Sequence, residues 1–311
     1  MDLEASGEQQ AIVEAVRALL ARHAGPARAI ELAAKGAYDS ALEAALGAAG
    51  FLDVARAEGT GPLEAALVVE EVARAGGTAA VGAAALVGPC ALGERALPGP
   101  IALASGAAGT PVRFAAHART LVVDAGEVAR VVTLAPGEAE VVVSSYGYPL
   151  GRLPSLEGRG ESAGAGSGEA LRRWWRVALA AELAGTLRAA LDVTLAHVKQ
   201  RRQFGRAIGS FQAVQHRLAE CHVLVEGSAW LTREAAWRGA DAESAAAAAA
   251  FAGAAAARVF TETHQLSGAI GYTREHDLHV FSMRLQALRL ELGGVGAHRR
   301  ALASARWVGG P

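Results

Sequence analysis

Residues 197–216, HVKQRRQFGRAIGSFQAVQH, interrupt a pattern that otherwise runs through the second half of the chain. Apolar residues recur at helical spacing on both sides of this stretch. Gly205 breaks the spacing and Phe211 opens the next apolar stripe. Arg201 and Arg202 stand in the last turn of the first helix, where cations meet the negative end of the helix dipole. The stretch predicts a corner between two long helices, and solvated arginines alone would account for its charge.

Four long helices are predicted around this corner, over 169–200, 210–238, 241–266 and 275–303. Short connections between long helices are typical of an up-and-down bundle. Alanine, the best helix former, supplies much of the 52% hydrophobic content, whereas aromatic residues make up only 5%. We therefore expect the helices to pack closely through small side chains.

The first hundred residues also read as helical. Helices are predicted over 8–22, 40–49, 62–75 and 79–97, the last interrupted at Gly88-Pro89. Gly25-Pro26 ends the first helix. Glu70 and Glu71 are most simply interpreted as a solvated helix face.

The pattern of apolar residues changes after Pro98-Gly99-Pro100, where they alternate or form short blocks. Strands are predicted over 101–105, 112–115, 120–124, 128–134 and 140–145. The fold class is therefore mainly α with a small β domain. We predict a helical domain over 1–98, a reduced antiparallel β domain over 99–156, a Gly/Ser-rich linker over 157–168 and a four-helix bundle over 169–308.

Composition excludes several functions. The net charge of −1 gives no electrostatic basis for binding nucleic acid. Cys90 and Cys221 are too few for a disulfide framework or a zinc site. His276, Asp277 and His279 lack an established zinc spacing, so no metal site is expected. The polar N-terminus and an alanine run too short to span a bilayer predict a soluble, cytoplasmic protein.

The corner also carries a spaced motif, Arg201, Phe204 and Gly205 followed by Phe211 and Gln212. This spacing resembles the hallmark of the acyl-CoA dehydrogenase family. In that family the corner contacts the FAD diphosphate across a subunit interface. The resemblance implies FAD as cofactor, with Arg201, Phe204 and Gln212 among its contacts.

A second stretch, HQLSGAIGYTREHDLHVF at 264–281, reads by itself as a turn between helices. Beside the first motif it resembles the family's glycine-rich segment that holds the FAD of a neighbouring subunit. Gln265, Gly268 and Gly271 carry over, while Ala269 replaces a family glycine. The run EHDLH resembles a subgroup that handles bulky acyl-CoA thioesters, including steroid-derived ones in actinobacteria.

The order of helical domain, β domain and four-helix bundle is also the order of the acyl-CoA dehydrogenase fold. AAGFLDV and GPLEAALVVEEVARAGG resemble the family's N-terminal domain. In the helix before the corner, Arg176 matches a family arginine near the thioester site. The alternative is that Arg176 is one of several cations, with Arg172 and Arg173, at a helix start.

The family reaction removes a proton beside the thioester carbonyl, which requires a carboxylate as general base. The two family positions for this base correspond to Gly293 and Trp175, and neither carries a carboxylate. Glu291 is the nearest candidate, although two residues along a continuous helix turn a side chain by about 200°. A solvated glutamate is the simpler interpretation of Glu291.

Two further family features are missing. The loop that contacts the flavin ring has only ALASGAAG, 102–109, near its place, and the adenine-contacting Thr and Gln are replaced within Gly294–Ala297. The leading hypothesis is therefore an FAD-dependent acyl-CoA dehydrogenase subunit that completes the flavin site of a homologous catalytic partner, in a heterotetramer. The resemblance implies an acyl-CoA as the substrate and an electron-transfer flavoprotein as the electron acceptor, with oxygen as the alternative acceptor.

Two alternatives remain open. The chain could be a self-sufficient homo-oligomeric acyl-CoA dehydrogenase with a displaced base, Glu291 or Glu275. It could also be a non-enzymatic helical assembly module that has lost FAD. Activity of the purified chain separates the first alternative from the partner hypothesis, and bound flavin counts against the second.

Overall fold

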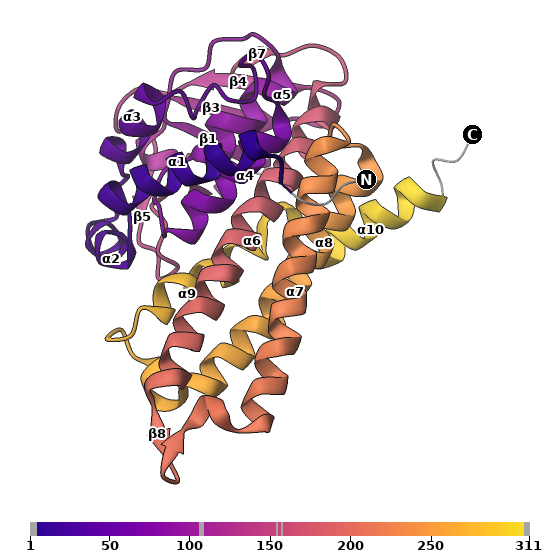
Figure 1. The fold of residues 1–311 in the computed structure, drawn as a ribbon. Helices are drawn as coiled ribbons and strands as arrows, with labels where there is room; N and C mark the ends of the chain where they lie inside the picture. The colour runs from indigo at the N-terminus through magenta and orange to yellow at the C-terminus, as the bar shows by residue number, and fades with distance from the viewer. Residues whose placement is uncertain (1–4, 106–108, 154, 157, 308–311) are drawn as a thin grey trace.

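A tapering bundle of long helices carries a layer of shorter helices and strands at its wide end (Figure 1). The computed structural model describes residues 5–105, 109–153, 155–156 and 158–307. Three bundle helices follow the predicted segments closely: α6 (Ser167–Gln200), α7 (Gln212–Trp237) and α8 (Ala242–Ser267). The predicted fold class, mainly α with a small β region, is confirmed.

The fourth bundle helix is not continuous, so the single helix predicted over 275–303 is wrong. The chain forms α9 (Leu278–Leu288), a 3-10 turn η5 (Glu291–Gly293) and α10 (Gly294–Trp307). Leu292, Gly293 and Gly294 all have positive φ, at 51°, 82° and 70°. Glycine adopts such angles without steric cost, so two adjacent glycines permit a sharp break. Beyond it, α10 packs on α8 and projects from the side of the bundle (Figure 1).

The N-terminal layer contains one helix that was not predicted. Its elements are α1 (Gly7–His23), α2 (Pro26–Lys35), α3 (Ser40–Ala48), α4 (Pro62–Arg74), a π-helical segment η1 (Gly82–Val87) and α5 (Gly88–Leu92). Gly25-Pro26 ends α1 as expected, but Pro26 also begins α2. Proline suits the first helical turn, where its missing N–H is not needed.

The strands form two small sheets, β1-β3-β4-β7 and β2-β6-β5. They are β1 (Ile101–Ser105), β2 (Val112–Arg113), β3 (Thr120–Asp124), β4 (Ala129–Thr133), β5 (Glu140–Val142), β6 (Leu150–Arg152) and β7 (Glu161–Ser162). The expectation of purely antiparallel pairing is wrong, because β1 pairs with β3 in parallel, with Ile101 opposite Thr120. A parallel pair needs a crossover, and here β2 and the 3-10 turn η2 (Ala115–His117) lie between the two strands. β7, which pairs with β4, lies within the range predicted as a linker.

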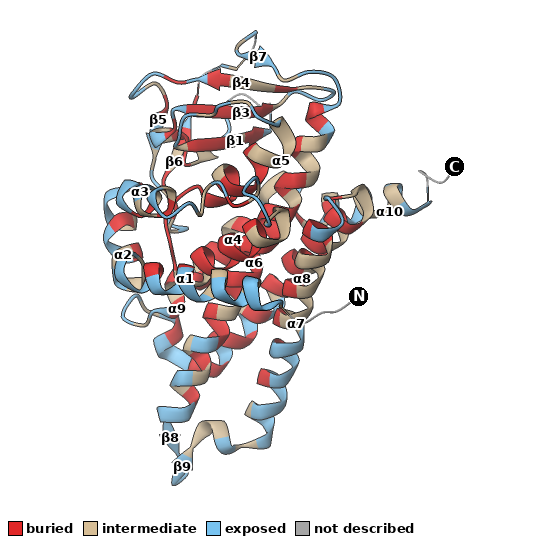
Figure 2. Cartoon of the chain, turned by 45° about the horizontal axis from the view of Figure 1, so that its top comes forward, coloured by how far each residue is buried: buried red, intermediate tan, exposed pale blue. Residues whose placement is uncertain are grey.

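The core runs without interruption along α4, α6 and α8 into the sheet (Figure 2). The solvated face predicted for Glu70 and Glu71 is wrong, because both are buried, with 6% and 7% of their surfaces exposed. Glu70 accepts hydrogen bonds from Arg233 of α7 at 3.2 Å, and Glu71 pairs with Arg17 of α1 at 2.7 Å. Buried carboxylates persist only when paired in this way, so the two glutamates fix α4 to its neighbours.

Residues Ala242–Tyr272 form a helical stretch that is long and apolar enough to cross a membrane, judged by length and composition. The sequence predicts instead an alanine run too short to span a bilayer. In the structure 61% of the apolar window is buried, since α8 packs against α6, α7 and α10. Its apolar residues therefore serve as the core of the bundle.

Gly185 allows α6 and α4 to approach closely, because a Cβ atom there would lie 2.0 Å from the Glu70 carbonyl oxygen. Gly185→Ala should therefore lower the free energy of unfolding by at least about 2 kcal/mol, through overpacking. Urea unfolding followed by circular dichroism measures this change. Gly47→Ala is the matched control in α3, since its Cβ would make only an ordinary contact of 3.6 Å with Leu52. Equal effects of the two substitutions would contradict the close approach.

Candidate functional site

A cavity of about 330 Å³ opens where the N-terminal layer, the strands and α6 meet. The break between α9 and α10 closes one side of it. The lining includes Gly82, Leu103, Arg113, Phe114, Trp175, Leu179, Glu182, Leu290, Glu291 and Gly293. Every layer of the fold therefore contributes to this one cavity.

A charged cluster centred on Arg113 occupies the cavity wall. Its Nη1 lies 2.7 Å from Oε2 of Glu182, and its Nε donates to Oε1 of Glu291 at 2.8 Å. Trp175 adds a hydrogen bond from its indole N–H to Oε2 of Glu291 at 3.2 Å. The three charged side chains are 11–19% exposed, so the cluster is a mostly buried network of two carboxylates and one guanidinium.

Two aromatic rings contact this guanidinium, one just after β2 and one just before β6. The Arg113 guanidinium carbon lies 5.1 Å from the Phe114 ring centroid and 4.9 Å from that of Tyr148. Arg284 of α9 stands 4.7 Å from the Tyr148 ring and donates to the Gly77 carbonyl at 2.8 Å. Such cation–π contacts are stronger when the cation is withdrawn from water. The cluster is therefore a fixed part of the packing.

Burial and charge act in opposite directions on these groups. Burial raises the pKa of Glu182, Arg113 lowers it and Glu291 raises it further, with a net rise. For Arg113, burial lowers the pKa, but the two carboxylates more than compensate, so the pKa is raised. Arg113 therefore stays charged, and its removal would leave two like charges facing each other.

Both family positions for the base lie on this cavity, since Gly293 and Trp175 line it. Glu291 lines it as well, because η5 is a tight turn and the far-face argument from a continuous helix does not apply. The interpretation of Glu291 as a solvated glutamate is wrong, because both of its oxygens accept hydrogen bonds from Arg113 or Trp175. A carboxylate engaged in this way has little freedom to accept a substrate proton.

Arg176, the predicted substrate-site residue, is not among the residues that line the cavity. It lies on another face of α6, half-buried, where burial and nearby Arg172 lower its pKa. Burial and, to a smaller extent, the charge of Arg176 together lower the pKa of His298 of α10 to about 4. The role of Arg176 toward a substrate stays a prediction.

The predicted corner forms a hairpin at the narrow end of the bundle. Strands β8 (Arg202–Gln203) and β9 (Arg206–Ala207) are joined by Phe204 and Gly205, with φ of 52° and 77°. Positive φ at both positions is the signature of a two-residue hairpin turn. The α6 helix ends at Gln200, so the expectation that Arg201 and Arg202 belong to its last turn is wrong.

The hairpin presents an aromatic side chain and free cations to solvent. Phe204 is 92% exposed and meets the ring of Phe211 edge-on, with centroids 6.1 Å apart. The guanidinium of Arg206 covers the Phe211 ring at 4.0 Å. Within the described part of the chain, Arg201, Arg202 and Arg206 form no ion pair with a carboxylate.

The second predicted segment lies beside this hairpin. Gln265 and Gly268 are exposed at the end of α8, and the 3-10 turn η4 (Gly268–Tyr272) contains Gly271. His276 follows this turn and meets His197 of α6, with ring centroids 5.4 Å apart. Gln212, also exposed, begins α7. The residues predicted to contact flavin thus gather at one end of the bundle, and none of them lines the cavity.

Comparison with known proteins identifies the family. The acyl-CoA dehydrogenase N-terminal domain matches residues 6–93, and the acyl-CoA dehydrogenase C-terminal domain matches residues 170–306. The chain belongs to the acyl-CoA dehydrogenase family. The resemblance stated from the corner motifs is confirmed.

Among relatives, acyl-CoA dehydrogenase FadE34 of Mycobacterium tuberculosis is 34% identical over 149 residues, 46% of this chain and 21% of the relative. Acyl-CoA dehydrogenase IpdE2 of Mycolicibacterium smegmatis is 35% identical over 115 residues, 37% of each chain. The alignments thus span from about a fifth to two fifths of these curated relatives.

Solved structures share the whole fold. A chain of the ChsE4-ChsE5 complex from Mycobacterium tuberculosis superposes with a TM-score of 0.82, at 22% identity, over 100% of both chains. A chain of the Tcur3481-Tcur3483 steroid acyl-CoA dehydrogenase, in its G363A variant, gives 0.83 at 24% identity, over 97% of this chain and 98% of that one. These likenesses show a common fold.

Sequence reasoning missed Arg113 and Glu182. Arg113 follows one valine in a two-residue strand and carries no recognisable signal. Glu182 is different, because it is an acidic residue within the apolar run VALAAELAG of α6. A charge inside a buried helix face requires a partner, and this could have flagged the site.

Family membership raises the question of where FAD would fit. The cavity cluster holds two carboxylates against one arginine, which disfavours an anionic diphosphate. The bundle end fits better, because its unpaired arginines and exposed Phe204 suit a diphosphate and an adjacent planar ring. Among the described residues no group of His, Cys, Asp and Glu could hold a metal ion.

Arg113→Met should destabilise the fold by about 3–5 kcal/mol near neutral pH, because it leaves buried carboxylates unpaired. The folded-state pKa of Glu182, already raised by burial, would rise further. A folded protein that keeps a proton lost on unfolding becomes less stable as pH rises, so the deficit should shrink at acidic pH. Urea unfolding at both pH values measures it.

Arg152→Met is the control for this experiment, because Arg152 is an exposed arginine in β6. It should change stability by less than about 0.5 kcal/mol at either pH. A deficit of Arg113→Met that does not depend on pH would contradict the assignment of the cluster. Adding Glu182→Gln and Glu291→Gln should recover much of the loss.

Proposed function

We propose that this chain is a subunit of a two-component acyl-CoA dehydrogenase and completes the flavin site of a homologous catalytic partner. The observation that carries this proposal is the separation of two surfaces. The predicted flavin contacts lie at an exposed bundle end, whereas the chain's own cavity has no unengaged carboxylate at either position of the base.

The bundle end has the character of a contact surface for a cofactor held elsewhere. Phe204 and Tyr272 are large aromatic side chains that are 92% and 73% exposed. The arginines of the hairpin pair with no carboxylate among the residues that the structure describes. A diphosphate bound by a second subunit would pair with these charges, and the aromatic rings would be covered at the same time.

The chain's own cavity supports the proposal that a partner subunit supplies the catalytic base. Gly293 and Trp175 stand where a carboxylate is needed, and Glu291 is engaged by Arg113 and Trp175. The fold neighbours support a heteromer, since the ChsE4-ChsE5 structure is described as a complex and the Tcur3481-Tcur3483 structure as a steroid acyl-CoA dehydrogenase. We propose a bulky, steroid-like acyl-CoA as the substrate class and an electron-transfer flavoprotein as the acceptor.

In this assembly the chain binds and orients. Arg201 would hold a diphosphate oxygen, Phe204 would cover the cofactor at the interface, and Gln212 and Gln265 would donate hydrogen bonds from their amides. FAD supplies the redox chemistry when bound, by accepting hydride from the substrate. The proton beside the thioester carbonyl would go to a carboxylate of the partner.

Flavin absorbance tests whether the chain needs a partner subunit to bind FAD. The chain expressed alone should be colourless or nearly so, and co-expression with the partner should give a stable yellow complex. A yellow lone chain that bleaches on addition of an acyl-CoA would overturn the proposal in favour of the self-sufficient enzyme. A colourless complex that lacks flavin would favour the assembly module.

Arg201→Ala should weaken flavin retention by the complex roughly ten- to hundredfold, the value of one hydrogen bond to a charged group. The ratio of flavin absorbance to protein after dialysis measures this loss. Arg22→Ala, at an exposed arginine of α1, is the matched control and should retain its flavin. Retention by both variants would place the diphosphate elsewhere.

Glu291→Gln separates the two enzymatic hypotheses. If the partner supplies the base, the kcat of the complex should change less than about threefold, since the amide oxygen can still accept from Trp175. If Glu291 is a displaced base, kcat should fall by about a hundredfold or more. Unfolding curves for the variant confirm that any loss reflects chemistry.

A further inference from the structure

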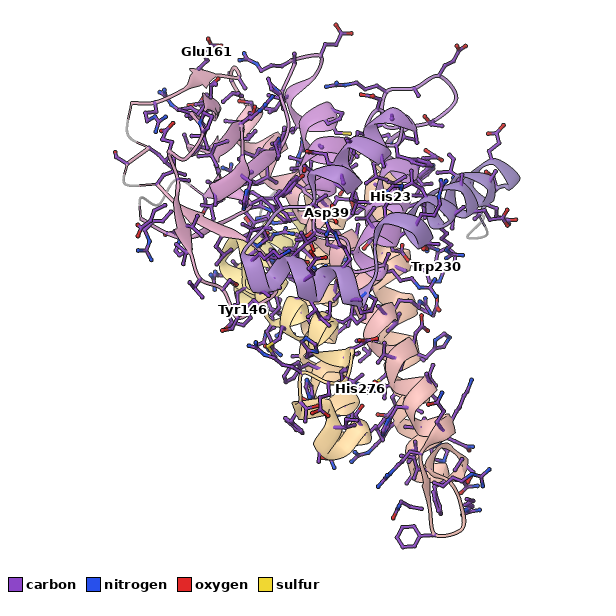
Figure 3. The ribbon with its side chains drawn as sticks, turned by 90° about the vertical axis from the view of Figure 1, so that its left-hand side faces the viewer. His23, Asp39, Tyr146, Glu161, Trp230 and His276 are labelled. Atoms are coloured by element: carbon purple, nitrogen blue, oxygen red, sulfur yellow. The ribbon has the colours of Figure 1, made fainter. Side chains whose placement is uncertain are left out.

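A second cavity of about 350 Å³ lies between α2, the chain from β5 to β6, and the corner where α8 passes into α9. It shares no lining residue with the first cavity. Figure 3 looks onto this side of the molecule, where α2 crosses α9, Tyr146 lies at the edge of the strands and His276 lies lower on the bundle. The proposed function makes no use of this space, apart from Gly271 and Tyr272 on its wall.

The cavity wall contains a buried histidine without a normal hydrogen bond. His264 is 4% exposed and its ring lies between Phe260 and Tyr272, at centroid distances of 4.4 Å and 4.9 Å. Neither ring nitrogen makes a hydrogen bond of normal geometry with a described residue. Burial lowers the pKa of His264, and the nearby Gly271 backbone only partly opposes this. The neutral ring therefore offers a donor and an acceptor, which are costly to leave unmatched.

The charged groups of this wall are all cationic or can become so. Arg274, His279 and Arg284 line the cavity, and no Asp or Glu is among the described lining residues. Arg274 is exposed and has no carboxylate partner in the part of the chain that the structure describes. The Nε of Arg284 is buried and makes no hydrogen bond there. This arrangement favours an anion.

The remaining surface is apolar. Ala29, Ile30 and Ala33 of α2 face Val280 and Met283 of α9 across the cavity. A small inorganic anion would leave these side chains uncovered, whereas a chain of several methylenes would bury them, at about 0.8 kcal/mol for each group. The cavity therefore combines an anion-binding group with an apolar slot.

We propose that this cavity binds a small amphipathic carboxylate. The acid group lies at Arg274 and His279, the alkyl chain runs between α2 and α9, and the His264 ring faces the ligand. The site is distinct from the flavin-contact surface, with which it shares Gly271 and Tyr272. It depends on the described residues of this chain alone.

Octanoate is the probe, titrated calorimetrically into the full-length chain in the assembly in which it purifies. We expect one binding site per chain and at least roughly tenfold weaker binding of 1-octanol, which lacks the charge. Arg274→Gln should weaken octanoate binding by a similar factor. Because Arg274 is exposed, this variant should fold normally, and Arg299→Gln on α10 serves as its control.

Cavity-filling variants locate the site. Ala33→Trp should abolish octanoate binding, whereas Leu103→Trp, which narrows the first cavity, should leave it unchanged. The reverse pattern, or no binding of octanoate, would overturn the proposal. So would an Arg274→Gln complex that loses flavin but still binds octanoate, because the arginine would then belong to the cofactor surface.

Discussion

The packing of α6 against every other layer is the constraint on which the structure depends. This helix of 34 residues contacts α4, α7, α8, α9 and the strands. Small residues make that possible, above all Gly185, where the α4 backbone leaves no room for a Cβ atom. A helix buried on all sides must also satisfy any polar group it carries. Glu182 is such a group, and its pairing with Arg113 connects the packing of the bundle to the cavity.

The cavity combines the two positions predicted for a catalytic base with a cluster of buried charges. Its walls come from the expected elements, and both positions of the catalytic base face it. Arg113 nevertheless links two carboxylates there, and a buried ion cluster is most stable when complete. The same interaction that stabilises the three layers engages the carboxylate nearest the reactive position.

At the bundle end, in contrast, the charged groups are exposed and are not paired with one another. Its hairpin leaves Phe204 in solvent, and its arginines form no ion pair with a carboxylate of the described residues. This is the surface that the proposed assembly would cover. The cavity beside His264 differs again, since its unmatched groups are buried and its charges are cationic. The first cavity, the bundle end and the cavity beside His264 thus differ in whether the chain supplies partners for their charged groups.

Local periodicity, turn residues and short spacings in the sequence were enough to predict most of the helices, most of the strands and the two motifs at the bundle end. The break between α9 and α10 at Leu292 was not predicted from the sequence, because positive φ at three successive residues is a property of the folded backbone. The parallel pairing of β1 with β3 and the burial of Glu70 were not predicted either, for a related reason. Both are set by contacts between segments distant in the chain. Only the tertiary structure brought Arg113, Glu182 and Glu291 together, because 69 and 109 residues separate successive members of that cluster and no local pattern connects them.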